Sequence, residues 1–221
     1  MSTMIKAIKQ ATILDVSEFI SCEKLPADRY SEMKYPKLIP LMRFHVDRYK
    51  LEGFGHLMVM HTETKMGMEL ITMSFMPSEC VNLPYLLVDA MSMKKKKCVF
   101  VEYYGCGNDD LNDGKLKEVY EKFSSLPDYT EKENWYIRER RPYSLIKQGE
   151  EDELVDMAAQ SVKAYLLSVK DCHVDKSYAD KLRAFRDRMI NEGNPSSATL
   201  KMLLKEDGAK AFMENVIMPL K

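Results

Sequence analysis

Hydrophobic and polar residues alternate through much of the first half of the chain. The run MRFHVDRYKL begins this pattern near residue 41, and four strand-like runs follow it: HLMVMHTETKM, MELITMSFMP, YLLVDAMSM and KKCVFVEYYG. A period of two is typical of a β-strand with one buried face. The connecting segments are short and turn-like and leave no room for a crossover helix. We therefore expect an antiparallel meander over about residues 41–105.

The chain from residue 110 to 221 is mainly helical in pattern. Apolar residues recur at helical spacing in residues 115–126, 150–171 and 177–193, and two short closing helices are expected at 195–208 and 209–220. Residues 2–30 look helical or irregular, and 134–147 are ambiguous. A meander followed by helices predicts an α+β fold in a single domain, residues 1–221. We expect an α/β/α sandwich, with the N-terminal helix on one face of the sheet, the C-terminal helices on the other, and a ligand between sheet and helices.

Composition narrows the function classes. The chain has 33 basic and 34 acidic residues among 221, so overall charge does not point to a nucleic-acid partner. No apolar run approaches the length of a membrane span, and the N-terminus lacks the apolar core of a signal peptide. The five cysteines are scattered, which favours neither a disulfide framework nor a zinc site. We expect a cytoplasmic protein with no bound metal and no membrane partner.

One acid interrupts an apolar strand. In YLLVDAMSM, alternation places Tyr85, Leu87, Asp89 and Met91 on the same face. If that face is covered, burial should raise the pKa of Asp89, which suits a proton donor. The alternative is an acid near a strand end that is solvated or paired with a lysine.

Two clusters of basic residues can likewise be interpreted either as solvated surface or as binding sites. KKKK at 94–97 is either a solvated turn between strands or a docking point for an acidic carrier protein or ligand carboxylates. Arg138, Arg140 and Arg141 lie beside two aromatic residues and form either a surface cluster or a carboxylate-binding site.

Two segments resemble the ferredoxin-dependent bilin reductases. One reads FMP at 75–77 and then NLPYLLVD at 82–89; the other is the closing segment NPSSATLKMLLKEDGAKAFMENVIMPL, in which Thr199 and Gly208 keep the family spacing. The resemblance runs from about residue 40 to the end of the chain. It implies the same sandwich fold, with a linear tetrapyrrole held between the sheet and the C-terminal helices.

The resemblance also implies a chemistry. Such enzymes carry no metal or flavin; electrons arrive singly from reduced ferredoxin or flavodoxin, and side chains supply protons. Asp89 occupies the position of the proton-donating acid. Thr72 stands where members place a His or Asn opposite that acid, and Ser197 stands where several members have a second acid. Three alternatives follow: proton delivery uses other groups, for which Glu69, His61 and Glu102 are candidates on neighbouring strands; the reaction differs; or the chain only binds the tetrapyrrole.

The resulting hypothesis is an oxidoreductase that reduces a linear tetrapyrrole. Its catalytic candidates are Asp89, Thr72, Ser197, His61 and Glu69, and the candidates for substrate contact are Lys94, Lys97, Arg138, Arg141, Tyr85 and Met91. A non-catalytic tetrapyrrole-binding protein is the alternative, because the usual partners of Asp89 are replaced. The related red chlorophyll catabolite reductases share the fold, so another open tetrapyrrole is also compatible. A third reading is an unrelated α+β interaction module.

Overall fold

The computed structural model describes residues 1–79, 81–94, 96–105, 113–168, 176–194 and 196–220. It contains an eight-stranded sheet, in which the order is β1-β3-β4-β5-β6-β7-β8 and β2 also pairs with β3. Every strand pair is antiparallel. The strands are β1 (Cys22–Lys24), β2 (Glu32–Tyr35), β3 (Met42–Leu51), β4 (Gly55–Thr64), β5 (Met68–Pro77), β6 (Tyr85–Met93), β7 (Lys96–Tyr104) and β8 (Leu145–Gln148).

The five long strands confirm the predicted meander, and three short strands extend it. β1 and β2 lie along β3, and β8 lies along β7. The sequence did not reveal them because three or four residues are too few to show an alternation. β8 also resolves part of the ambiguous segment, which begins with a short 3₁₀ helix, η1 (Trp135–Glu139).

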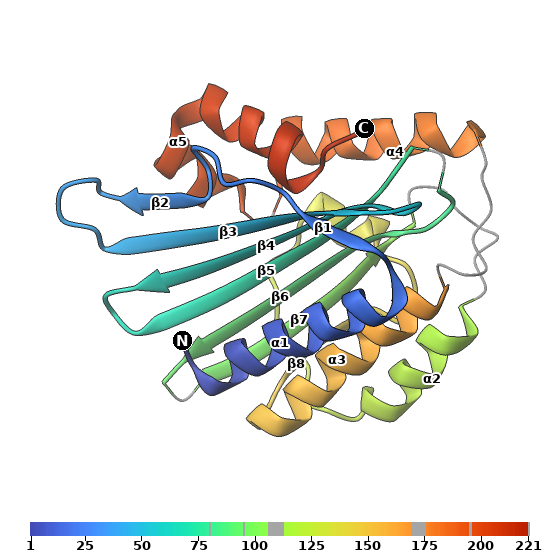
Figure 1. Cartoon of the computed structure of the whole chain (residues 1–221). Coiled ribbons are helices and arrows are strands. Elements are labelled where there is room, and N and C mark those ends of the chain that lie inside the picture. The colour runs from blue at the N-terminus through green and yellow to red at the C-terminus, as the bar shows by residue number, and fades with distance from the viewer. Residues whose placement is uncertain (80, 95, 106–112, 169–175, 195, 221) are drawn as a thin grey trace.

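Helices cover both faces of the sheet, as expected (Figure 1). One face carries α1 (Thr3–Phe19), α2 (Gly114–Phe123) and α3 (Glu151–Ser168), and we call it the closed face. The other carries α4 (Lys176–Asn191), α5 (Ser197–Phe212) and the final turn η3 (Met213–Ile217), and we call it the cavity face. The expected placement was wrong for α3, which packs beside α1 rather than with the later helices. Residues 169–171 and 195 of the predicted helices lie outside the described residues.

Local sequence explains where several elements begin and turn. The Ser2 hydroxyl accepts a hydrogen bond from the backbone N–H of Ile5 and caps α1. The first turn of α3 is acidic, which its helix dipole favours. Gly55 adopts φ +147°, and a Cβ there would meet the Met76 carbonyl oxygen, so only glycine fits where β4 starts beside β5.

The closing segment contains two helical stretches, as expected, but the break between them lies elsewhere. α5 is kinked at Lys205, which has φ 62°, and it runs on through Gly208, where the break was expected. Each sheet face has its own apolar core: Leu86 and Val88 of β6 belong to the closed face, whereas Tyr85 and Leu87 belong to the cavity face. The alternation predicted for β6 is therefore the one observed. Among the described residues, no helix is long and apolar enough to cross a membrane.

Candidate functional site

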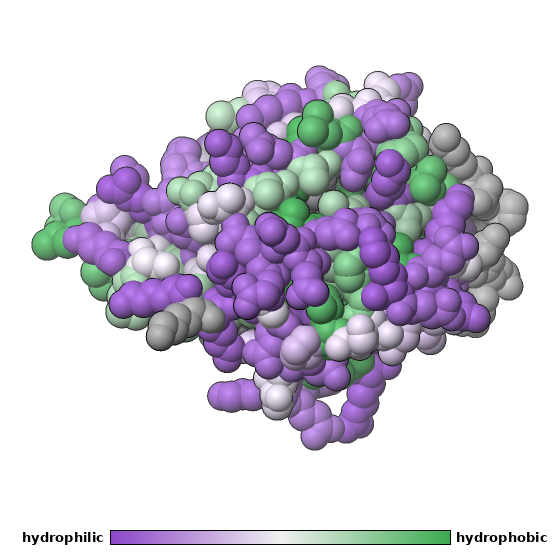
Figure 2. All heavy atoms as spheres, turned by 90° about the horizontal axis from the view of Figure 1, so that it is seen from below, coloured by the Kyte–Doolittle hydropathy of each residue, from purple (hydrophilic) through white to green (hydrophobic). Residues whose placement is uncertain are grey.

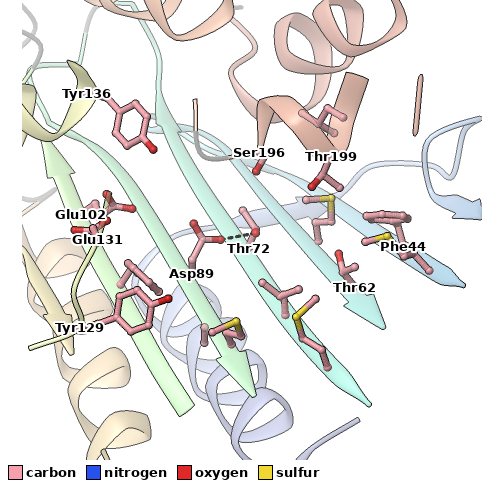
Figure 3. A pocket seen from close by; sticks show the side chains of 18 residues that line it. Phe44, Thr62, Thr72, Asp89, Glu102, Tyr129, Glu131, Tyr136, Ser196 and Thr199 are labelled. Carbon is pink, nitrogen blue, oxygen red and sulfur yellow. Dashed lines mark hydrogen bonds between the residues drawn. The ribbon is translucent and has the colours of Figure 1, made fainter. Parts of the chain in front are cut away.

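A cavity of about 320 Å³ lies between the middle of the sheet and the start of α5 (Figure 3). Strands β3 to β7 supply most of its wall, and the irregular segment after α2 closes one end. Its lining residues are Met42, Phe44, Met60, Thr62, Met68, Leu70, Thr72, Asp89, Ala90, Met91, Phe100, Glu102, Tyr129, Glu131, Tyr136, Ser196, Thr199 and Leu200. The volume falls at the lower end of the range for small-molecule sites, about 300–1,000 Å³.

Asp89 and Thr72 meet on the cavity wall. They are directly paired across β5 and β6, and the Thr72 hydroxyl donates a hydrogen bond to the Asp89 carboxylate (Figure 3). Burial raises the pKa of Asp89 to about 7, and the negative charge of Glu102 adds to this, while the Thr72 hydrogen bond opposes it. Asp89 is therefore able to hold and release a proton near neutral pH.

A charged cluster closes one end of the cavity. Glu102 on β7 is buried, and it accepts hydrogen bonds from the Arg140 Nε and the Tyr104 hydroxyl, each at 2.7 Å. Arg140 also binds Glu131 through two nitrogens, at 2.6 and 2.8 Å. Burial raises the pKa of Glu102, and the Arg140 guanidinium works against that rise. The guanidinium thus compensates two carboxylates that the cavity would otherwise leave unpaired.

The start of α5 contributes hydroxyl groups to the cavity. Ser196 and Thr199 line it, whereas Ser197 does not. The Ser197 hydroxyl instead accepts a hydrogen bond of 2.7 Å from the backbone N–H of Asn194, next to the helix start. Ser197, at the position where the family resemblance implied a second acid, therefore stabilises the turn before the helix. Its neighbour Ser196 reaches the cavity.

His61 and Glu69 lie on the closed face, on the opposite side of the sheet from Asp89. The His61 Nε2 is 3.3 Å from a Glu69 carboxylate oxygen, which also accepts a hydrogen bond of 2.6 Å from the Ser2 backbone N–H. His61 is buried, and burial lowers its pKa. The expectation that these two groups assist Asp89 is thus wrong, because the sheet separates them from the cavity. Glu102 is the alternative candidate that does share the cavity.

None of the four basic residues proposed to contact the substrate lines the cavity, and three of them form ion pairs elsewhere. Lys97 forms an ion pair of 2.7 Å with Glu151 of α3, and Arg141 forms one of 2.8 Å with Asp113. Arg138 is exposed and pairs with Glu133 at 2.8 Å. Lys94 is exposed in the β6–β7 turn, and Lys95 lies outside the described residues.

The two uncharged candidates for substrate contact, Met91 and Tyr85, differ in their access to the cavity. Met91 lines the cavity. Tyr85 shares its face of β6 but is buried among aromatic side chains, with its ring 5.9 Å from Tyr104 and 6.2 Å from Phe185. Its role in this structure is therefore to pack beneath α4.

Sequence reasoning did not identify several cavity residues. Tyr129 and Glu131 belong to an irregular segment without a periodic pattern, so nothing local indicated where they point. Thr62 could have been found, because alternation on β4 places it on the face of Met60, opposite His61. Arg140 stood in a noted basic cluster, but its partner Glu102 lies 38 residues earlier.

The fold has a counterpart among solved structures. A crystal structure of phytochromobilin synthase from tomato in complex with biliverdin matches 96% of this chain and 82% of its own, with a TM-score of 0.77 and 14% sequence identity. This chain has the fold of that bilin reductase. The remote resemblance seen in the sequence is thereby confirmed for the fold. No family model matches the chain, and no curated protein matches it.

Proposed function

We propose that this protein binds a linear tetrapyrrole in the cavity and reduces it, with Asp89 as a proton donor and a ferredoxin or flavodoxin as the electron donor. The observation that carries the proposal is the placement of Asp89. Its carboxyl group stands on the wall of a largely apolar cavity with a pKa raised to about 7. General acids work best when their pKa lies near the operating pH.

The cavity lining also matches such a ligand. Three carboxylic acids, Asp89, Glu102 and Glu131, stand among apolar walls, and among the described lining residues there is no lysine, arginine or histidine. Carboxyl and hydroxyl oxygens on this wall can accept hydrogen bonds from the N–H groups of pyrrole rings. Because no cation stands among the described lining residues to bind them, carboxylate substituents of the ligand project from the cavity in our proposal, together with the part of the tetrapyrrole that exceeds its volume.

The proposed reaction balances as follows. Reduction of one double bond takes two electrons, delivered one at a time by the carrier, and two protons. Asp89 gives one proton to the ligand and becomes a carboxylate, which the Thr72 hydroxyl is placed to stabilise. Solvent then returns a proton to Asp89. The second proton comes from solvent, and the hydroxyl groups of Ser196 and Thr199 at the start of α5 are placed to relay it.

An anaerobic titration with biliverdin tests this function. We expect the absorbance spectrum of biliverdin to shift on binding, and the bound pigment to bleach or change colour when reduced ferredoxin is added. Asp89→Asn should retain the shift and lose most of the change. If the wild-type protein causes no shift with biliverdin or with another open tetrapyrrole, the proposal is wrong.

A non-catalytic tetrapyrrole-binding protein is the second candidate. The start of α5 favours this candidate. It is where the family resemblance implied a second acid, but among its described residues it brings two hydroxyl groups and no carboxylate to the cavity. In the titration this candidate predicts a spectral shift that persists unchanged after reduced ferredoxin and reduced flavodoxin are supplied.

A further inference from the structure

Large apolar side chains are exposed together at one end of the sheet. Leu38, Ile39 and Leu41 in the β2–β3 connection are 95%, 68% and 54% exposed, and Met66 in the β4–β5 turn is 84% exposed. We call these four residues the apolar tip. Single exposed apolar residues are ordinary, but a cluster of this kind marks a surface for interaction.

The two turns that form the apolar tip are neighbours. The backbone N–H of Lys65 donates a hydrogen bond of 2.9 Å to the carbonyl of Leu41, and Met42 pairs with Thr64 at the ends of β3 and β4. In Figure 1 the β2–β3 connection projects beyond the body of the molecule, and hydrophobic atoms gather at the same edge in Figure 2. The tip is therefore a protrusion rather than a flat face.

Positive charge surrounds the apolar tip. Lys34, Lys37, Arg43 and Lys65 are all exposed. Neither residues 34–41 nor residues 65–67 include an acid. The acids nearest along the strands are Glu32, Glu63 and Glu69. Glu32 and Glu63 lie 2.6 and 3.8 Å from the ring nitrogens of His45, and Glu69 lies 3.6 Å from the N-terminal amino group. The β6–β7 turn, with exposed Lys94, lies at this end of the sheet too, because Met68 pairs with Met93.

We propose that the apolar tip docks this protein on an anionic lipid surface, with Leu38 and Ile39 inserted at the level of the headgroups. A protruding apolar element ringed by lysine and arginine fits a bilayer interface, where apolar burial and attraction to anionic lipid act together. A flat protein partner would leave much of such a protrusion uncovered. This proposal departs from the sequence-based expectation of no membrane partner. That expectation rested on the lack of a spanning segment, which surface docking does not need.

Docking would bring the cavity close to the lipid. Met42 follows Leu41 directly and Met68 follows Gly67, and both methionines line the cavity. The end of the cavity that they form therefore lies next to the apolar tip. The docking proposal does not depend on the ligand or on catalysis. The lipid-docking proposal and the proposed tetrapyrrole function can therefore each fail without the other.

Sedimentation of the whole protein with vesicles tests the proposal. We expect binding to vesicles made of equal amounts of phosphatidylcholine and phosphatidylglycerol, and much weaker binding to phosphatidylcholine alone. Ile39→Asp should lower the bound fraction by about fivefold or more, because it places a carboxylate at the inserted position. Leu14→Asp is the matched control, since Leu14 on α1 is also 68% exposed but lies on the closed face. The control should bind as the wild type does.

Three results would overturn the proposal. The first is a lack of binding to both kinds of vesicle, and the second is an equal loss of binding in Ile39→Asp and Leu14→Asp. The third is a wild-type protein that self-associates in light scattering and becomes monomeric in Ile39→Asp, which would assign the tip to contact with a second copy of the chain. A further variant, Lys37→Glu with Lys65→Glu, should abolish the preference for phosphatidylglycerol while circular dichroism shows an unchanged fold.

Discussion

On each face of the sheet, burial shifts the pKa of an ionisable residue in the direction that favours its uncharged form, but the two residues differ in their access to a ligand. On the closed face, His61 is buried beneath the start of α1 with a lowered pKa, next to Glu69. On the cavity face, Asp89 has a raised pKa and stands beside empty space. Burial produces both shifts, but only Asp89 can reach a ligand. A perturbed pKa therefore indicates function here only together with access.

The two faces also differ in how densely their aromatic side chains are packed. Phe75 of β5 lies on the closed face and packs against Tyr165 of α3, with ring centres 5.9 Å apart. Phe44 of β3 lies on the cavity face and lines the cavity. The closed face therefore contributes stability, whereas the cavity face gives up part of its packing to form a site.

Phe75→Ala should lower the free energy of unfolding by about 3–5 kcal/mol, because it removes a fully buried ring from the closed face. Urea denaturation measures the loss. Ligand affinity of the folded protein should stay unchanged. Phe44→Ala is the matched comparison: it should cost less stability and alter affinity for biliverdin. Equal effects of the two variants on affinity would contradict the division between the faces.

Asp89→Asn should lower turnover of the bound tetrapyrrole by about a hundredfold or more, since a positioned general acid contributes about 10²–10⁴ in rate. Affinity should change little, because the amide keeps the shape of the side chain. Single-turnover absorbance after addition of reduced ferredoxin measures the rate. Thr62→Val, which alters another cavity residue, serves as the control. Turnover at the wild-type rate would remove Asp89 from the mechanism.

Thr72→Val should shift the pH dependence of turnover. The wild-type rate should fall as pH rises through about 7, where Asp89 loses its proton. The Thr72 hydrogen bond favours the carboxylate, so its loss raises the pKa of Asp89 further and moves the fall to higher pH. A pH series of single-turnover rates measures the shift. A profile that stays in place, or moves to lower pH, would contradict the assignment.

Stability should depend on pH with opposite signs on the two faces. Burial holds the folded-state pKa of His61 below the ordinary value of 6.5, so the free energy of unfolding should fall as pH drops below about 6.5. The folded-state pKa of Asp89 lies above 3.8, so its contribution should make the free energy of unfolding fall as pH rises from about 4 to 7. His61→Phe should reduce the first dependence and Asp89→Asn the second, as measured by urea denaturation across a pH series. The assignment would be contradicted if His61→Phe removed the pH dependence between about 4 and 7 that is attributed to Asp89, or if Asp89→Asn removed the dependence below about 6.5 that is attributed to His61.

Much of the sheet could be read from the sequence alone. Alternation located the five long strands and placed Asp89 on the same face as Leu87 and Met91, because the direction of a strand side chain follows from its parity. The position of Thr72 opposite Asp89 was implied by the family resemblance, and the structure pairs the two residues on adjacent strands. These are local or nearest-neighbour properties, which a sequence pattern carries directly.

Other parts of the candidate site depend on contacts between distant segments. The sequence determined that an acid would stand on a sheet face, but the tertiary structure decided that this face is the one left partly open. It also decided that α3 packs beside α1, that Glu102, Arg140 and Glu131 meet, and that Ser196 rather than Ser197 reaches the cavity. The physical reason is that periodicity defines which face of an element is apolar, whereas the partner that covers this face is selected by packing of the whole chain.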